Sequence, residues 1–352
     1  MTGRLSVLWL QSGGCGGCTM SLLCAQPGDL LTSFDDAHVE LAWHPSLSAA
    51  SGDETRALLD RFESDIEPLG ILCVEGAILR GPAGTGRFHR ASGTGEPMWE
   101  RVRRLAARAE YCVAVGGCSA YGGMTAAGSN PAEACGLQYE GRRRGGALGP
   151  SYTSRRGMPV INIAGCPIHP GWVVETLGLL ARHHLRIADL DLWQRPRFIA
   201  DHLVHHGCPR NEYYEYKASA REPGQLGCLM EHLGCLGTQA HGDCNLRSWN
   251  GEGSCTRGGY ACINCTDPEF EEPRHSFLET PKIAGIPVGL PTDMPKAWFV
   301  ALSSLAKAAT PDRLRRNAQA SRIVVAPADG PHGARAEGAA VRRSGRRRPR
   351  KD

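Results

Sequence analysis

The stretch LSVLWLQSGGCGGCTMS (residues 5–21) decides the fold, because a short apolar run ends in a glycine-rich loop that carries two cysteines. A continuous apolar run of this length is typical of a strand that is buried on both faces of a parallel sheet. Glycines around Cys15 and Cys18 let backbone N–H groups approach the two sulfurs. The stretch therefore predicts a buried first strand that delivers two thiols to one edge of a sheet.

The first half of the chain continues this pattern by alternating short apolar strands with helical segments. Strands are predicted at residues 6–10, 39–43, 71–74, 111–115 and 160–163. Helices are predicted at residues 19–25, 54–67, 98–109, 119–126 and 172–183. Strict alternation of this kind predicts an α/β fold, in which helices cover both faces of a parallel sheet.

Cysteines follow three of these strands at the points where the strands end. Cys15 and Cys18 follow the first strand, Cys118 follows the fourth and Cys166 follows the fifth. The carboxyl ends of parallel strands share one edge, where ligands bind, so the four thiols are expected to converge. Thiolates suit iron–sulfur clusters and zinc. A structural zinc ion or ordinary buried cysteines remain the alternatives.

The second half of the chain carries two further sets of soft ligands. After about residue 195 no strand is predicted, and glycine, cysteine, histidine and asparagine crowd residues 201–268, so this part is expected to be organised around inorganic centres. One set is His205, Cys208, Cys228 and Cys235, with His202 or His206 as alternatives to His205. The other is Cys244, Cys255, Cys262 and Cys265, for which a zinc ribbon is the alternative.

Three sets of four ligands are better explained together than apart, because three iron–sulfur clusters in a row form a path for electrons. A zinc-binding scaffold without catalytic activity is the competing hypothesis. The other four cysteines are predicted to be small buried apolar side chains. They are Cys24, Cys73, Cys112 and Cys135.

The bulk composition limits where such a protein works. The 352 residues suggest two domains, and the 15 cysteines without an evident signal peptide favour metal ligation in a reducing, cytoplasmic setting. No apolar run reaches the roughly 18 residues of a membrane helix, so no membrane partner is expected. The net charge of +4 comes from the end of the chain, since residues 341–352 sum to +6. This basic tail lacks aromatic residues, so no nucleic-acid partner is expected.

Several motifs, in order, resemble the small subunit of a nickel–iron hydrogenase over about residues 5–310. They are LWLQSGGCGGCTMSLL, CVEGAI, AVGGCSAYGGMTAAG, NIAGCPIHPGW, HHGCPRNEYYE and GYACINC. The resemblance implies a flavodoxin-like, doubly wound domain over residues 1–195 and an irregular, mostly helical and loop iron–sulfur domain over residues 196–310. A basic tail without fixed structure is expected over residues 311–352.

The resemblance also implies a role for each set of ligands. Cys15, Cys18, Cys118 and Cys166 match the ligands of a proximal [4Fe–4S] cluster. The set with His205 matches a distal [4Fe–4S] cluster, although Cys228 and Cys235 are one residue further apart than usual. Cys244, Cys262 and Cys265 match a medial cluster, and Cys255 predicts that it is [4Fe–4S] rather than [3Fe–4S]. We call these the proximal, distal and medial sets.

In this family the nickel–iron centre belongs to a separate large subunit, so the chain is expected to carry electrons and to contain no catalytic residue. Glu75 is a candidate proton relay or a hydrogen-bonding loop residue. No twin-arginine export signal is evident, and Gly14 and Met20 stand where many members have glutamates. These departures resemble the regulatory class, which senses hydrogen in the cytoplasm and signals to a histidine kinase. The tail would then contact the kinase. The alternative is a cytoplasmic uptake hydrogenase, and a dimer of heterodimers is left open.

Overall fold

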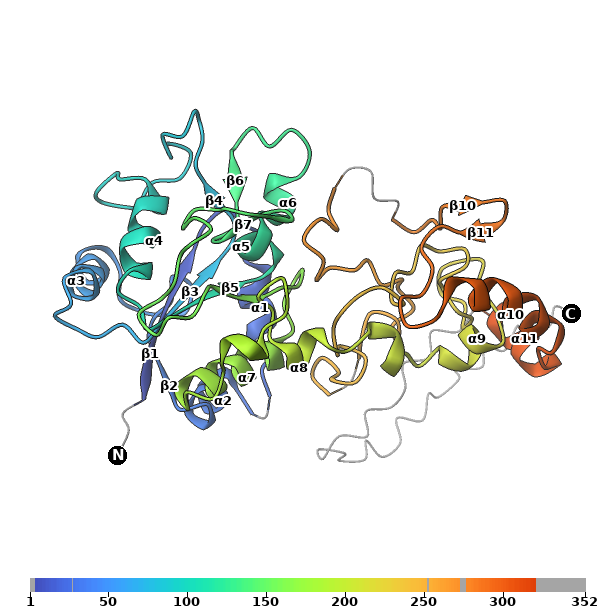
Figure 1. Ribbon diagram of the computed structural model, residues 1–352. Coiled ribbons are helices and arrows are strands. Elements are labelled where there is room, and N and C mark those ends of the chain that lie inside the picture. The colour runs from blue at the N-terminus through green and yellow to red at the C-terminus, as the bar shows by residue number, and fades with distance from the viewer. Residues whose placement is uncertain (1–3, 27, 252, 273–276, 321–352) are drawn as a thin grey trace, which may run out of the picture.

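The computed structural model describes residues 4–26, 28–251, 253–272 and 277–320. They form two lobes side by side, a first lobe with the sheet (residues 4–195) and a second lobe built mostly of loops (residues 196–320) (Figure 1). Within the described part of the chain, every helix is too short or too polar to cross a membrane.

The first lobe is built on one sheet of five parallel strands in the order β2-β1-β3-β5-β9. The strands are β1 (Leu5–Gln11), β2 (Val39–Trp43), β3 (Ile71–Glu75), β5 (Tyr111–Val115) and β9 (Ile161–Ile163). All five predicted strands are confirmed. This order is that of a flavodoxin-like, doubly wound sheet, as the sequence predicts.

Helices cover the two faces of the sheet and create two separate apolar cores. Leu22, Phe34 and Trp172 pack on one face with side chains such as Trp9. They come from α1 (Gly17–Leu22), α2 (Leu30–Asp36) and α7 (Pro170–Ala181). The other face packs against α3 (Gly52–Glu63), α4 (Met98–Ala106) and α5 (Gly117–Tyr121). Because β1, β3 and β5 are buried on both faces, their residues are apolar almost without interruption.

Several small elements of the first lobe have no counterpart in the sequence prediction. Besides α2, they are β4 (Ile78–Leu79), β6 (Ala134–Cys135), β7 (Tyr139–Glu140), β8 (Arg143–Arg144) and the 3-10 turn Ile187–Asp189; the helix predicted at residues 119–126 is divided into α5 and α6 (Gly123–Ala126). The four strands form two antiparallel pairs of two residues each. Strands of this length carry no readable periodicity, because their pairing depends on loops brought together by the sheet.

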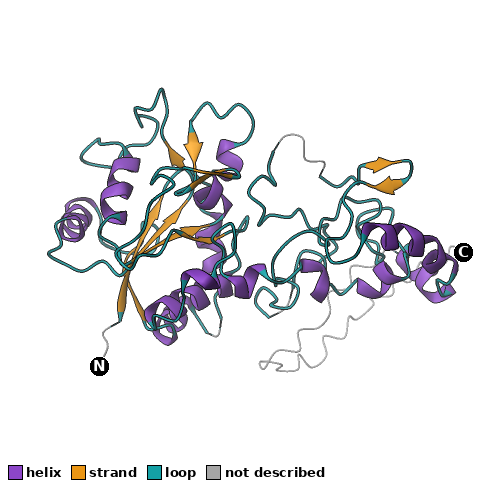
Figure 2. Ribbon diagram, viewed as in Figure 1, coloured by secondary structure: helices purple, strands orange, loops and turns teal. Residues whose placement is uncertain are grey.

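The second lobe has little regular structure (Figure 2). Its helices are α8 (Arg197–Ala200), a 3-10 turn at Val204–Gly207, α9 (Asn211–Glu215), α10 (Lys296–Ala308) and α11 (Asp312–Ala318), and β10 (Lys282–Ile283) pairs with β11 (Ile286–Pro287). Each of its buried apolar groups contains only three buried side chains, whereas the first lobe has two large cores. The lobe therefore depends on something other than apolar burial.

Two expectations about the second lobe need correction. A strand pair, β10–β11, occurs where no strand was predicted. Helix α11 forms within residues 311–352, which were predicted to lack fixed structure. The burial of Leu314 and Ala318 against Ala218 stabilises this helix. The rest of that tail, residues 321–352, lies outside the described residues.

Candidate metal centres

The proximal set lies at the carboxyl edge of the sheet. Cys15 and Cys18 occupy the loop between β1 and α1 and the start of that helix, Cys118 lies on α5, and Cys166 follows β9. Burial raises the pKa of the Cys166 thiol to about 12, and neighbouring Cys118 and Cys15 contribute to the rise. The pKa of Cys18 is also raised, mainly by burial. The structure therefore brings all four predicted thiols together.

Glu75, at the end of β3, binds the loop that carries this set. Its Oε1 accepts the backbone N–H groups of Cys18 and Thr19, each at 3.1 Å. Its Oε2 accepts Trp9 Nε1 at 3.1 Å, Gln11 Nε2 at 3.3 Å and the Thr19 hydroxyl. With five donors facing two oxygens in a buried site, Glu75 acts as an acceptor-only carboxylate. This geometry favours the hydrogen-bonding role over the proton relay.

Replacement of Glu75 by Gln is expected to destabilise the loop. In either orientation, the side-chain amide of the Glu75→Gln variant would place its NH₂ group against hydrogen-bond donors. Donors that lose their acceptor in a buried site cost about 1–3 kcal/mol. We expect a lower unfolding temperature and weaker iron retention. Glu110→Gln is the matched control, because Glu110 pairs with Arg156 near the surface and such pairs contribute about 0–1 kcal/mol. Equal unfolding temperatures for the two variants would contradict this role.

The distal set surrounds a cavity in the second lobe. Its lining includes His205, Cys208, Cys228 and Cys235. His205 packs edge-on against Tyr214, with 4.2 Å between the ring centroids, and burial lowers the pKa of its imidazole. His206 instead faces Asp293, with 3.3 Å between Nε2 and Oδ2. Of the three histidines that the sequence left open, the structure places His205 with the cysteines.

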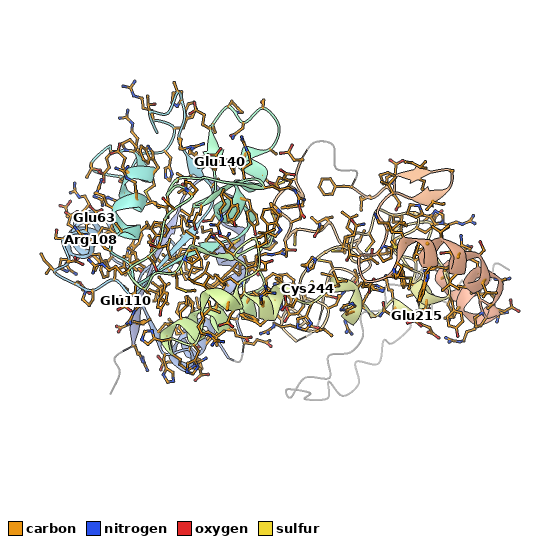
Figure 3. The ribbon with its side chains drawn as sticks, in the orientation of Figure 1. Glu63, Arg108, Glu110, Glu140, Glu215 and Cys244 are labelled. Carbon is orange, nitrogen blue, oxygen red and sulfur yellow. The ribbon has the colours of Figure 1, made fainter. Side chains whose placement is uncertain are left out.

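The medial set lies between the other two. Burial raises the pKa of the Cys244 thiol, and Cys265 and Cys255 raise it further. Cys262 is also close to Cys265 and Cys244, which help raise its pKa after burial. In Figure 3 the Cys244 side chain lies where the two lobes meet, and it packs against the first-lobe core. Cys255 is the exposed member of this set.

The three sets form one continuous series. The proximal and medial sets meet where Cys265 lies beside Cys166. The medial and distal sets meet where the backbone N–H of Cys262 donates to Cys235 Sγ at 3.3 Å. Thiols as far apart in sequence as Cys15 and Cys265 thus belong to one line that runs from the sheet edge into the second lobe.

The donor sets fit clusters of several metal ions. Among the described residues, no three His, Cys, Asp or Glu side chains lie close enough together to hold a single metal ion. Burial raises the pKa of most of these thiols, and the positive charge of a bound metal favours their deprotonation to thiolates. Such sets of neighbouring thiols are therefore suited to hold iron–sulfur clusters, in which different irons take different thiolates.

The remaining cysteines occupy other parts of the first lobe. Cys73, Cys112 and Cys135 are fully buried in its cores. Cys24 is only partly buried, contrary to expectation, because it follows the short helix α1 near the surface.

Some residues near the centres were missed by the sequence analysis. Arg210 and Lys217 lie beside the distal set, and His44 hydrogen-bonds to Thr19 beside the proximal set. Burial lowers the pKa of His44 to about 4. Only the closeness of Arg210 to Cys208 in the sequence could have pointed to one of these residues.

Comparisons with known proteins give the family of both lobes. Residues 15–180 match the family described as NADH ubiquinone oxidoreductase, 20 Kd subunit. Residues 201–278 match the family described as the C-terminal part of the NiFe/NiFeSe hydrogenase small subunit. The two matches cover the proximal set on one side and the distal and medial sets on the other.

Relatives with known names are similar over most of the chain. The F420 non-reducing hydrogenase II small subunit of Methanosarcina mazei is 36% identical over 292 residues, which are 76% of this chain and 73% of that protein. The periplasmic [NiFeSe] hydrogenase small subunit of Desulfomicrobium baculatum is 31% identical over 78% of this chain and 87% of its own length.

A solved structure has the same fold. It is an actinobacterial-type NiFe-hydrogenase from Ralstonia eutropha H16, which aligns with a TM-score of 0.70 at 28% identity. The alignment covers 92% of this chain and 95% of that one.

Proposed function

Because this chain belongs to the family of nickel–iron hydrogenase small subunits, we propose that it transfers electrons to or from a large subunit that holds the nickel–iron centre. Small subunits of this family carry iron–sulfur clusters and pair with such a large subunit. The observation that carries the proposal is the continuous line of three thiol sets, which joins the sheet edge to the second lobe.

The residues of each set would hold one cluster. Cys15, Cys18, Cys118 and Cys166 would hold the proximal [4Fe–4S] cluster, and the distal set would hold a second [4Fe–4S] cluster through three thiolates and the His205 imidazole. The medial set would hold a third cluster through Cys244, Cys262 and Cys265, with Cys255 as its fourth corner. When bound, such clusters accept and donate single electrons. The chain fixes their ligands by rigid attachment to strand ends and short turns.

Replacement of Cys255 by Ser is expected to convert the medial cluster from four irons to three. A hydroxyl is a harder and weaker ligand than a thiolate, so the iron at that corner would be lost. The oxidised variant should then show a three-iron electron paramagnetic resonance signal that the unmodified protein lacks. Cys24→Ser is the control, since Cys24 is also partly exposed but lies outside the three sets. The same signal in the unmodified protein would refute a four-iron medial cluster.

The names of the relatives favour a catalytic role, such as that of an uptake hydrogenase, over a sensor. Both named relatives are called hydrogenases, and one is named for the carrier that it does not reduce. Hydrogen sensing, with a histidine kinase contacting the tail, rests on the departures in the loop around Cys15 and on the basic tail. The sensor hypothesis also includes a cytoplasmic location and a histidine kinase as partner. We propose a dimer of heterodimers as its assembly.

One experiment separates these roles. The full-length chain and a version ending at Ser321 would be purified under nitrogen with their native partners, which are then identified by mass spectrometry. We expect a large hydrogenase subunit with both versions, and steady hydrogen oxidation when an artificial electron acceptor is added. Loss of a histidine kinase on truncation would favour the sensor. A colourless preparation without iron would refute the electron-transfer function.

A further inference from the structure

Arg210 is a buried cation beside the distal set. Its side chain extends from the start of α9 into the wall of the distal cavity, which it lines together with Cys208, Cys228 and Cys235. Its residue exposure is 8%. The guanidinium donates to the backbone oxygens of Thr256 at 2.8 Å, Gln225 at 2.6 Å and Gly227 at 2.7 Å. These bonds fix the charge in place.

No carboxylate of the described residues pairs with this guanidinium. The ionisable groups that act on it and could carry negative charge are the thiols of Cys208, Cys228 and Cys235, which line the same cavity, and the phenol of Tyr213. Arginine stays charged even when buried, and a buried charge is expensive unless an opposite charge compensates it. Three carbonyl dipoles satisfy its donors but add no net charge. A negatively charged group in the cavity would therefore compensate the charge of Arg210.

A second cation, Lys217, also lies beside Cys228. Lys217 Nζ is 3.9 Å from the centroid of the Tyr214 ring and 4.3 Å from that of Phe299. It makes no ion pair with a carboxylate of the described residues, although Glu231 and Glu215 act on it electrostatically, and Glu231 pairs with Lys307 at 2.6 Å. Lys217 and Cys228 also line one pocket together. Two cations thus lie beside the distal set.

The charge beside the proximal set has the opposite sign. The carboxylate of Glu75 lies against the Cys18 loop. At the medial set, Asp243 precedes Cys244 but pairs with Arg247 at 3.0 Å, so its charge is compensated. A centre that gains one electron gains one negative charge. A nearby cation stabilises that reduced state, and a nearby anion destabilises it, most strongly where water is excluded.

We propose that Arg210, assisted by Lys217, raises the reduction potential of the distal centre above that of the proximal centre. This inference rests on the proposed function, since it concerns clusters held by these residues. The charge pattern would favour electrons at the end of the series that is remote from the sheet. It therefore favours electron flow away from the proximal set, as hydrogen uptake requires.

The test is a potentiometric titration of the purified heterodimer, followed for each cluster by electron paramagnetic resonance. Arg210→Gln is expected to lower the equilibrium constant for reduction of the distal centre at least tenfold, which is about 59 mV for a one-electron couple. The proximal centre should keep its potential. Arg210→Lys keeps the charge and should retain most of the original potential. Arg221→Gln is the control, because Arg221 is an exposed cation of the same lobe.

The variants at position 210 distinguish an effect of charge from a purely structural role of Arg210. If Gln and Lys at position 210 shift the distal potential equally, Arg210 serves only to join three loops and the inference is wrong. An unchanged potential in Arg210→Gln would also overturn it. If Arg210→Gln does not fold, Lys217→Gln provides the same test. We expect this variant to lower the distal reduction potential by a smaller amount. An unchanged distal potential in Lys217→Gln would then refute the proposal. A heterodimer without any reducible cluster would refute the proposed function instead.

Discussion

Removal of iron is expected to unfold most of the second lobe while the first lobe keeps its fold. The first lobe has two large apolar cores on either side of a five-stranded sheet. Each buried apolar group of the second lobe contains only three buried side chains. Ordering one residue costs about 1–2 kcal/mol of backbone entropy, so groups of this size cannot order the long loops around them. Ligand binding by the medial and distal sets must contribute that free energy.

Hydrogen–deuterium exchange of the chelated protein under nitrogen measures this directly. Peptides from residues 201–251 and 253–272 should exchange at rates close to those of an unfolded chain. Peptides that contain β1, β3 or β5 should stay protected, which provides a control within the same molecule. Continued protection of residues 228–265 after complete iron removal would show that the lobe folds without its clusters.

The strands of the first lobe could be predicted from the sequence because burial on both faces leaves a continuous apolar run. The end of β3 is an instructive exception, since Glu75 belongs to the strand but is charged. Hydrogen-bond donors from β1 and α1 stabilise the Glu75 side chain at the edge of the sheet. The sequence around Glu75 does not indicate these donors, because they come from distant residues. Helix α2 was missed for a related reason, because it is short and its burial comes from packing beside α7.

The ligand sets could be predicted because cysteine spacing and strand ends are local features. Their arrangement in a row was also expected, but the contacts that join the sets, between Cys166 and Cys265 and between Cys235 and Cys262, depend on how distant loops pack and could not be predicted. Arg210 shows the same limit. Its position two residues after Cys208 is visible in the sequence, whereas its burial without a carboxylate depends on loops at residues 225–227 and 256.

Replacement of Gly116 by Ala is expected to disable the proximal set. Gly116 has φ +90° and ψ 160°, a conformation that is nearly restricted to glycine and costs another residue about 1–3 kcal/mol. A Cβ atom at this position would lie 2.6 Å from Cys18 Sγ. Overpacking of this kind costs roughly another 1–3 kcal/mol. Because Cys18 is held by Glu75 through its backbone, the thiol has little room to move away.

Iron content and the resonance signal of the proximal centre measure the effect. We expect Gly116→Ala to lose that signal and to unfold at a lower temperature. Gly157→Ala is the matched control, because Gly157 also has a positive φ of +72° but has no atom within 4 Å of a Cβ. Backbone strain should therefore lower the stability of both variants, while only Gly116→Ala should lose iron. Equal iron loss in the two would show that general destabilisation, and not the contact with Cys18, empties the site. Full iron content in Gly116→Ala would mean that the glycines around these cysteines are not needed to make room for the sulfurs.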